Sequence, residues 1–410
     1  MTHTPQDAPA PAAEHAWSPL YFLAALGAGG LAVTFFMYLM FWVPHPGQPV
    51  PVFEDILAYA TTAGAPGQAL VGLAVTGIAV FAALHIKLLV WNLRKLAAFQ
   101  RSEAYATLHT TNAESQLKGV PLTLAMAVNV GFILGLVFVP GLWGIVEYLF
   151  PLAILAFVAI GVFAFRLLGR FLGRILAEGG FDTRANTSFA QLLPAFALAM
   201  VGVGLAAPAA MSEVPWIVGT SLALSTFFTV AALLISAVML TLAIVSMVQH
   251  GTAPEAAPTL MILVPIVTVL GIAWMRTSHG LHTTLDVHGD AGATFMTLTK
   301  FLSVQILFAA LGLLVMARQG YAKRFLSLEG KRSAGSYALV CPGVALSVMG
   351  HFWVNKGLVG AGLVEQFSLA YWAFTAPALG LQVAMIALVW HLHRLHFARP
   401  RAPQTAAVPA

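Results

Sequence analysis

The residue best suited to chemistry in this sequence is its single cysteine, Cys341, which stands before Pro342 and Gly343 in an apolar stretch. A proline inside a helix removes one backbone hydrogen bond and clashes with the preceding turn. Lipid cannot satisfy the carbonyl group that this leaves free, so such a break needs protein or a watery cavity beside it. We therefore expect a membrane-depth helix over residues 336–355, broken at Pro342, with the thiol facing an interior lining. The alternative is a kinked packing helix with a buried, inert thiol.

Histidines form a second group of candidate ligands, in a predicted loop over residues 276–292. His279, His282 and His288 lie there together with Asp286. Imidazole and carboxylate groups suit zinc or copper, although this spacing matches no compact metal motif. The sequence thus offers a metal site at His279, His282 and His288, against the alternative of solvated loop histidines. A single cysteine excludes a cysteine-based zinc or iron–sulfur site.

A haem is a further alternative, because two histidines lie near membrane depth. His85 falls in a predicted helix over residues 67–93, and His351 falls in the helix over residues 336–355. Two facing axial histidines would bind haem b. Since each helix carries only one such histidine, we predict no cofactor.

The composition places the chain in a membrane. Of its 410 residues, 59% are hydrophobic and only 9% are charged, whereas a soluble domain carries about a quarter charged residues. We predict one membrane domain over residues 18–396, with disordered cytoplasmic tails over 1–17 and 397–410, which are rich in Pro and Ala. The net charge of +5 comes from helix ends, so it indicates membrane topology and no nucleic-acid partner.

Apolar segments long enough to cross a bilayer recur ten times. They cover residues 19–43, 67–93, 120–140, 143–168, 189–210, 216–248, 258–275, 293–316, 336–355 and 367–392. With both termini on one side, 16 of the 20 Lys and Arg residues fall on that side. Cytoplasmic segments carry an excess of these residues, so we predict ten spans with both termini in the cytoplasm.

Proline and glycine concentrate in the odd-numbered spans, counted along the chain. Examples are Gly29 and Gly30 in the first span, Pro194 in the fifth and Pro265 in the seventh. Interrupted helices often form transport sites. The pattern therefore predicts an all-α membrane protein of five helical hairpins, whose odd helices surround a central pore.

The polar side chains within the spans restrict the class of solute that could pass. Charged residues are nearly absent there, which argues against a proton relay or a carboxylate cation site. A lining of small and neutral polar groups, such as Asn129, Thr268 and Ser347, suits a weakly bound anion or a neutral solute. The alternative is that these groups form hydrogen bonds between helices.

Two short segments carry a family resemblance. Ala-Pro-Thr-Leu at 257–260, followed by Ile-Leu-Val-Pro at 262–265, is similar to the start of the seventh helix in the tellurite-resistance/dicarboxylate transporter family. That family includes TehA and the plant slow anion channels. Tyr-Ala-Leu-Val-Cys-Pro at 337–342 resembles the family's aromatic-Ala-aromatic-Thr-Phe-Pro segment, in which the Phe plugs the pore.

The resemblance implies a bacterial inner-membrane protein that assembles as a homotrimer and conducts small anions. Cys341 stands where the family has its gating Phe, so the passage is either wider here or gated by a reactive group. The Cys-Pro-Gly sequence is also similar to the TsoY group of membrane selenoproteins, which implies that selenocysteine can replace Cys341.

We therefore predict a channel or transporter for a small anion or solute, with the bilayer and further copies of the chain as partners. An enzyme is the less favoured class. The alternative is a membrane redox protein that uses Cys341 for sulfur or selenium chemistry, with or without a histidine-bound metal. The candidate pore and gate residues are Cys341, Pro342, Gly343, Gly29, Gly30, Asn129, Pro194 and Pro265.

Overall fold

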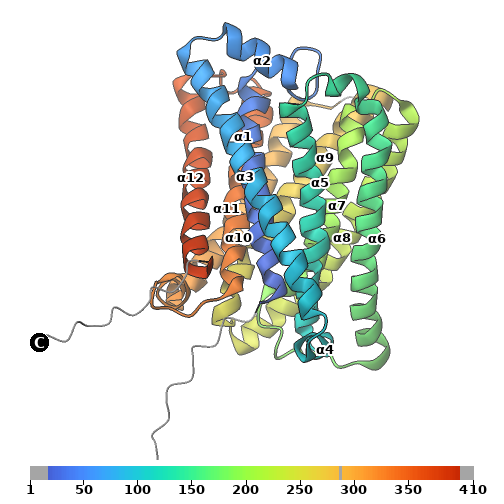
Figure 1. The fold of residues 1–410 in the computed structure, drawn as a ribbon, viewed down its shortest axis with the longest axis vertical. Helices are drawn as coiled ribbons and strands as arrows, with labels where there is room; N and C mark the ends of the chain where they lie inside the picture. The colour runs from blue at the N-terminus through green and yellow to red at the C-terminus, as the bar shows by residue number, and fades with distance from the viewer. Residues whose placement is uncertain (1–16, 286–288, 398–410) are drawn as a thin grey trace, which may run out of the picture.

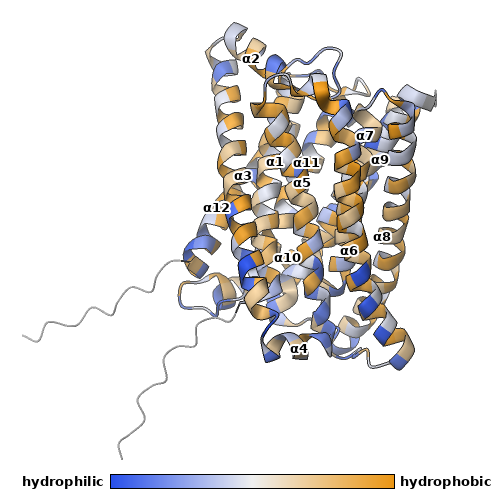
Figure 2. Ribbon diagram, turned by 45° about the vertical axis from the view of Figure 1, so that its right-hand side comes forward, coloured by the Kyte–Doolittle hydropathy of each residue, from blue (hydrophilic) through white to orange (hydrophobic). Residues whose placement is uncertain are grey.

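The computed structural model describes residues 17–285 and 289–397, so the predicted tails lie almost wholly outside the described residues. Within these ranges the secondary structure is helical, and ten helices are long and apolar enough to cross a membrane. The prediction of an all-α protein with ten spans is confirmed. Apolar residues cover the middle of the bundle and polar residues gather at its two ends (Figure 2).

The ten spans differ in how much protein surrounds them. In the odd-numbered spans between 56% and 94% of the most apolar window is buried, against 22% to 33% in the even-numbered spans. The first set therefore consists of inner helices and the second of outer helices. The inner helices are α1 (Phe22–Trp42), α5 (Gly119–Phe138), α7 (Leu193–Met211), α9 (Leu263–Leu285) and α11 (Val340–Phe352). The outer helices are α3 (Ala65–Phe99), α6 (Val146–Glu178), α8 (Pro215–His250), α10 (Ala291–Arg318) and α12 (Leu369–Phe397).

The inner helices form a closed ring. Packing runs from α1 to α5, α7, α9 and α11, and α11 packs against α1 again. Each outer helix packs against the inner helix that precedes it in the chain. Glycines permit the closest approach: a Cβ at Gly27 or Gly30 of α1 would lie 2.8 Å from a carbon of Val340 or Val344 in α11. Small residues at such contacts let membrane helices approach closely.

Each inner helix begins with a short 3-10 segment, and in four of them a proline follows within the first three α-helical residues. A proline fits there because the first N–H groups of an α-helix lack an intrahelical partner. These prolines are Pro121, Pro194, Pro265 and Pro342. The 3-10 segments are Pro19–Tyr21, Asn112–Lys118, Phe189–Leu192, Pro254–Met261 and Ala334–Leu339.

The predicted break at Pro342 is therefore wrong in its position. The span changes from a 3-10 helix to an α-helix after Leu339, and Pro342 is the third residue of α11. Pro265 likewise lies in the first turn of α9 and does not interrupt it. The second irregularity of the ninth span is a π-helical end over Trp353–Val359, which the sequence analysis missed.

The predicted loop over residues 276–292 is also wrong, because α9 continues to Leu285. Its last turns pack on α7: a Cβ at Gly280 would lie 2.3 Å from the carbonyl oxygen of Ala209. Arg276, His279 and His282 consequently lie on a helix. Two further short helices, α2 (Phe53–Thr62) and α4 (Glu103–His109), occupy segments predicted as loops.

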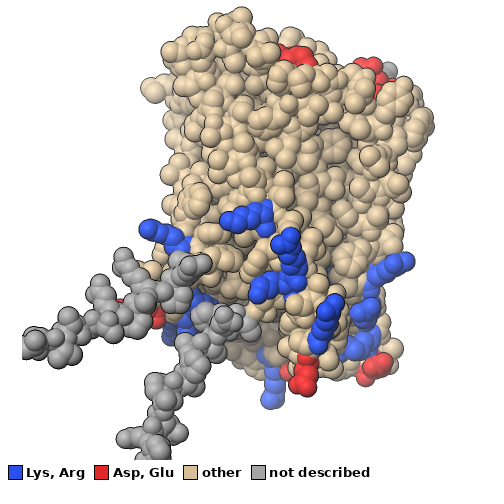
Figure 3. Space-filling view, in the orientation of Figure 1, with Lys and Arg blue, Asp and Glu red and all other residues tan. Residues whose placement is uncertain are grey.

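Lysine and arginine gather near one end of the bundle (Figure 3), which is the end where α1 begins and α12 ends (Figure 1). We call this the basic end. Because one outer helix separates each inner helix from the next, all five inner helices begin at the basic end and run in parallel. The far end holds α2 and the end of α9.

Candidate functional site

Two cavities enter the ring of inner helices from opposite ends. The large cavity, of about 750 Å³, reaches the far end at the exposed side chains of Asp290 and Lys356. The small cavity, of about 500 Å³, reaches the basic end at the exposed side chain of Glu255. Together the cavities extend along the axis of the bundle from both sides.

Three residues line both cavities and form the boundary between them: Phe196 of α7, Pro265 of α9 and Cys341 of α11. Each lies within the first four residues of its helix. The side chains of Phe196 and Cys341 are nearly closed to solvent, at 3% and 8% exposed. The boundary is thus one layer of side chains, at the level where three inner helices begin.

Other predicted pore residues line one cavity each. Gly30 and Asn129 line the large cavity, and Pro342 lines the small cavity. The Asn129 side-chain nitrogen donates to the Ala125 carbonyl oxygen at 3.1 Å and lies 3.8 Å from the Met200 sulfur. Asn129 is therefore a polar residue in a mostly apolar part of the cavity wall.

Three of the predicted residues line neither cavity. A Cβ at Gly29 would meet Met126 and His85 within 2.8 Å, and a Cβ at Gly343 would meet the Met385 sulfur at 2.4 Å. These two glycines allow helices to pack and leave no room for a pore. The third is Pro194, which is buried in the first turn of α7.

The large cavity has mostly apolar walls. Six of the chain's 14 methionines line it. The Thr268 hydroxyl donates its hydrogen to the carbonyl oxygens of Val264 and Ala345, at 3.1 and 3.2 Å. It therefore has no hydrogen left to donate into the cavity. The methionines are Met37, Met40, Met126, Met200, Met211 and Met275.

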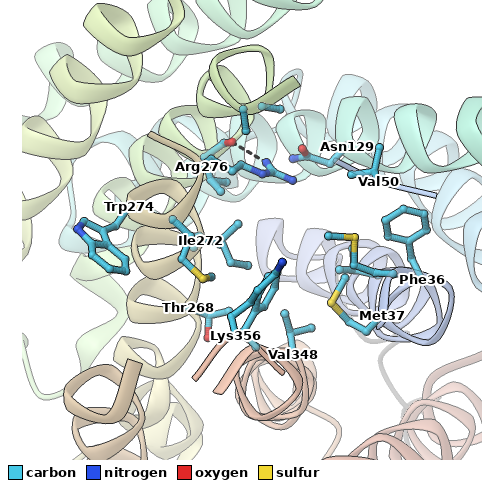
Figure 4. A pocket seen from close by; sticks show the side chains of 18 of the residues that line it. Phe36, Met37, Val50, Asn129, Thr268, Ile272, Trp274, Arg276, Val348 and Lys356 are labelled. Carbon is cyan, nitrogen blue, oxygen red and sulfur yellow. Dashed lines mark hydrogen bonds between the residues drawn. The ribbon is translucent and has the colours of Figure 1, made fainter. Parts of the chain in front are cut away.

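Arg276 supplies positive charge to this apolar cavity. Its guanidinium points across the cavity toward Asn129 (Figure 4) and donates to the carbonyl oxygen of Val203 at 2.8 Å. A guanidinium has five N–H donors, and within residues 17–285 and 289–397 Arg276 forms no ion pair. Charge inside a span is costly unless it is paired or serves a solute. Lys356 adds a second positive charge where the cavity meets the surface.

The small cavity has more polar walls, because the 3-10 segments that begin the inner helices surround it. The hydroxyls of Ser18, Ser188 and Ser333 each accept a hydrogen bond from a backbone N–H in the first turn of such a segment. All three serines line the small cavity. The positive ends of the helix dipoles are therefore directed at this cavity.

The predicted histidine metal site lacks a third ligand in the described chain. His279 and His282 line the large cavity on α9, and His288 lies outside the described residues. Across the residues that the structure does describe, no group of three His, Cys, Asp or Glu side chains could hold a metal ion.

The two histidines considered for haem lie at different heights. His85 contacts the Ala25 carbonyl oxygen through Nδ1 at 2.7 Å, whereas the His351 ring packs 5.9 Å from the Tyr38 ring. Ala25 and Tyr38 are separated by about 20 Å along α1, at 1.5 Å per residue. One iron cannot bridge that distance, so the structure does not support the haem alternative.

Sequence reasoning missed two residues of the site, Arg276 and Phe196. The loop predicted over residues 276–292 includes Arg276, although a lone charge directly after the apolar run 258–275 is a signal of a cavity residue. Phe196 gave no signal, since it is one of 27 phenylalanines. No protein-family model matches the chain, and a search of curated proteins gives no match.

Proposed function

We propose that the protein provides a passage for small anions through the inner ring of five helical hairpins. The observation that carries this proposal is the pair of cavities that meet at Phe196, Pro265 and Cys341. A single layer of side chains then separates the two sides of the membrane. Moving that layer would connect them.

The charge of the large cavity favours an anion over a cation or a neutral solute. Arg276 leaves most of its N–H donors unused by described residues. At the mouth the charge of Lys356 is offset by that of Asp290, so the guanidinium inside the cavity decides the sign. An anion that enters would pair with the guanidinium and offset its desolvation. The apolar wall favours an anion that loses its hydration shell easily.

The orientation follows from the positive-inside rule, which places the basic end in the cytoplasm. The small cavity then faces the cytoplasm and the large cavity faces outward. The ring of five inner helices supports the resemblance to the tellurite-resistance/dicarboxylate transporter family. The TsoY relationship, the homotrimer and the bacterial inner membrane stay predictions of that resemblance.

The described residues hold no metal-ligand cluster that would serve a metal-bound redox role for Cys341, and a redox role of the thiol alone stays a prediction. We place Cys341 at the boundary as a packing residue of the proposed passage, because its side chain is buried there and lines both cavities. The Cys341 side chain is small, so the aromatic ring at the boundary is that of Phe196.

Anion flux into proteoliposomes tests the proposal. We expect nitrate flux above that of empty liposomes, and we expect Arg276→Gln to lower it about tenfold or more, as for the loss of one charge-assisted contact. Arg166→Gln is the matched control, because Arg166 lies exposed on α6 and lines neither cavity. Flux equal to that of empty liposomes, or equal losses in both variants, would contradict the proposal.

A further inference from the structure

The small cavity contains buried polar atoms that the fold leaves without partners. The Ser115 hydroxyl oxygen and the Gln191 side-chain oxygen Oε1 form no hydrogen bond with any described residue. Both residues line the small cavity, and they are 0% and 5% exposed. Buried polar atoms are normally paired, so each unpaired atom calls for a specific explanation.

The hydrogen bond of the side-chain nitrogen fixes the orientation of the Gln191 amide. Its nitrogen Nε2 donates to the Asn112 carbonyl oxygen at 2.8 Å. The oxygen Oε1 must therefore be the free atom, and a carboxamide oxygen only accepts hydrogen bonds. The cavity consequently presents an acceptor that requires a donor on whatever binds beside it.

Hydroxyl donors line the same cavity. Ser188 and Ser333 accept backbone hydrogen bonds through their oxygens, and neither donates its hydrogen to a described residue. Ser115 adds a third hydroxyl. Helix N-termini surround these groups, which favours negative charge. The charged side chains in the lining are Glu255, exposed at the rim, and Arg332, which donates to the carbonyl oxygens of Ser327 and Leu328.

We infer that the small cavity binds an oxyanion that carries a hydrogen, such as hydrogencarbonate, in preference to an anion without one. Its oxygens would accept from Ser115 and the neighbouring hydroxyls, and its O–H group would donate to Gln191 Oε1. This rests on the proposed anion passage and names the class of anion that the cytoplasmic-side cavity selects.

Hydrogencarbonate and nitrate form a matched pair of probes. Both are planar, trigonal and singly charged, and only hydrogencarbonate can donate a hydrogen bond. The measurement is the thermal unfolding midpoint of the purified full-length protein, titrated with each sodium salt at one mildly alkaline pH. We expect hydrogencarbonate to bind about fivefold or more tightly than nitrate, the effect of one hydrogen bond to a buried acceptor.

Gln191→Met should remove that preference, because it removes the acceptor. Ser115→Ala should instead weaken the binding of both anions alike, because it removes a donor that either anion can use. The matched controls are Gln382→Met and Ser236→Ala, because Gln382 and Ser236 are also buried with an unpaired polar atom and line neither cavity. We expect both controls to keep the fivefold preference. Should Gln191→Met fail to fold, Gln191→Leu removes the same acceptor without adding charge and should also remove the preference for hydrogencarbonate over nitrate.

Equal affinity for the two anions in the unchanged protein would overturn the inference, as would a preference that survives in Gln191→Met. The binding measurement does not depend on transport. A preference for hydrogencarbonate without nitrate flux would therefore refute the proposed passage and leave the binding site in place.

Discussion

The two cavities use different sources of positive potential. The large cavity places one guanidinium, that of Arg276, among methionines and other apolar side chains. The small cavity is lined by serine hydroxyls and by the first turns of parallel helices. One arrangement explains both, because the polar starts of all five inner helices lie at the same end and their apolar middles surround the other cavity. Parallel inner helices thus give two chemically distinct cavities, which are the two halves of the proposed passage.

The boundary between the halves is the most sensitive place to disturb. Phe196→Ala removes the only aromatic ring that lines both cavities among the described residues. Because apolar constrictions close pores by excluding water, we expect nitrate flux to rise about tenfold or more. Proteoliposome flux measures the change.

The matched control for Phe196→Ala is Phe150→Ala. Phe150 is fully buried on α6 and lines neither cavity. We expect both variants to lose about 3–5 kcal/mol of unfolding free energy, whereas only Phe196→Ala raises flux. An increase in both variants would point to general loosening of the bundle and would refute a boundary at Phe196.

Cys341→Ser should have the smallest effect of the variants that touch the passage. A thiol at a buried site behaves as a small apolar group, and a hydroxyl occupies similar space. We expect nitrate flux to change by about twofold or less, measured beside the unchanged protein. Complete loss of function with normal folding would show that the thiol takes part in chemistry, which is the redox alternative.

Much of the fold could be predicted from sequence, and the site only in part. Ten spans are recognisable because each is a predominantly apolar run of membrane length. The inner helices are indicated by Pro194, Pro265 and Pro342, but not because these prolines interrupt them, as the sequence analysis predicts. They fit the first turn of a helix and cause no break in its middle.

The cavity residues were harder to predict because they depend on neighbours from other helices. Gly29 and Gly30 are adjacent in sequence, yet Gly29 packs against His85, whereas Gly30 packs against Val344 at the wall of the large cavity. Arg276 looked like a loop residue, since hydropathy cannot show that α9 continues along α7 beyond its apolar run. Which side of a helix faces a cavity depends on the neighbouring helices, so it can be determined only from the assembled ring.

Reaction of Cys341 from each side of the membrane tests the meeting of the two cavities most directly. The chain has a single cysteine, so a small membrane-impermeant thiol reagent reports on one position without background. In sealed proteoliposomes of uniform orientation that carry Phe196→Ala, we predict labelling of Cys341 and loss of nitrate flux with reagent on either side. Phe196→Ala combined with Cys341→Ser should resist both treatments. A thiol that reacts from neither side while nitrate still passes would contradict a passage that runs through this boundary.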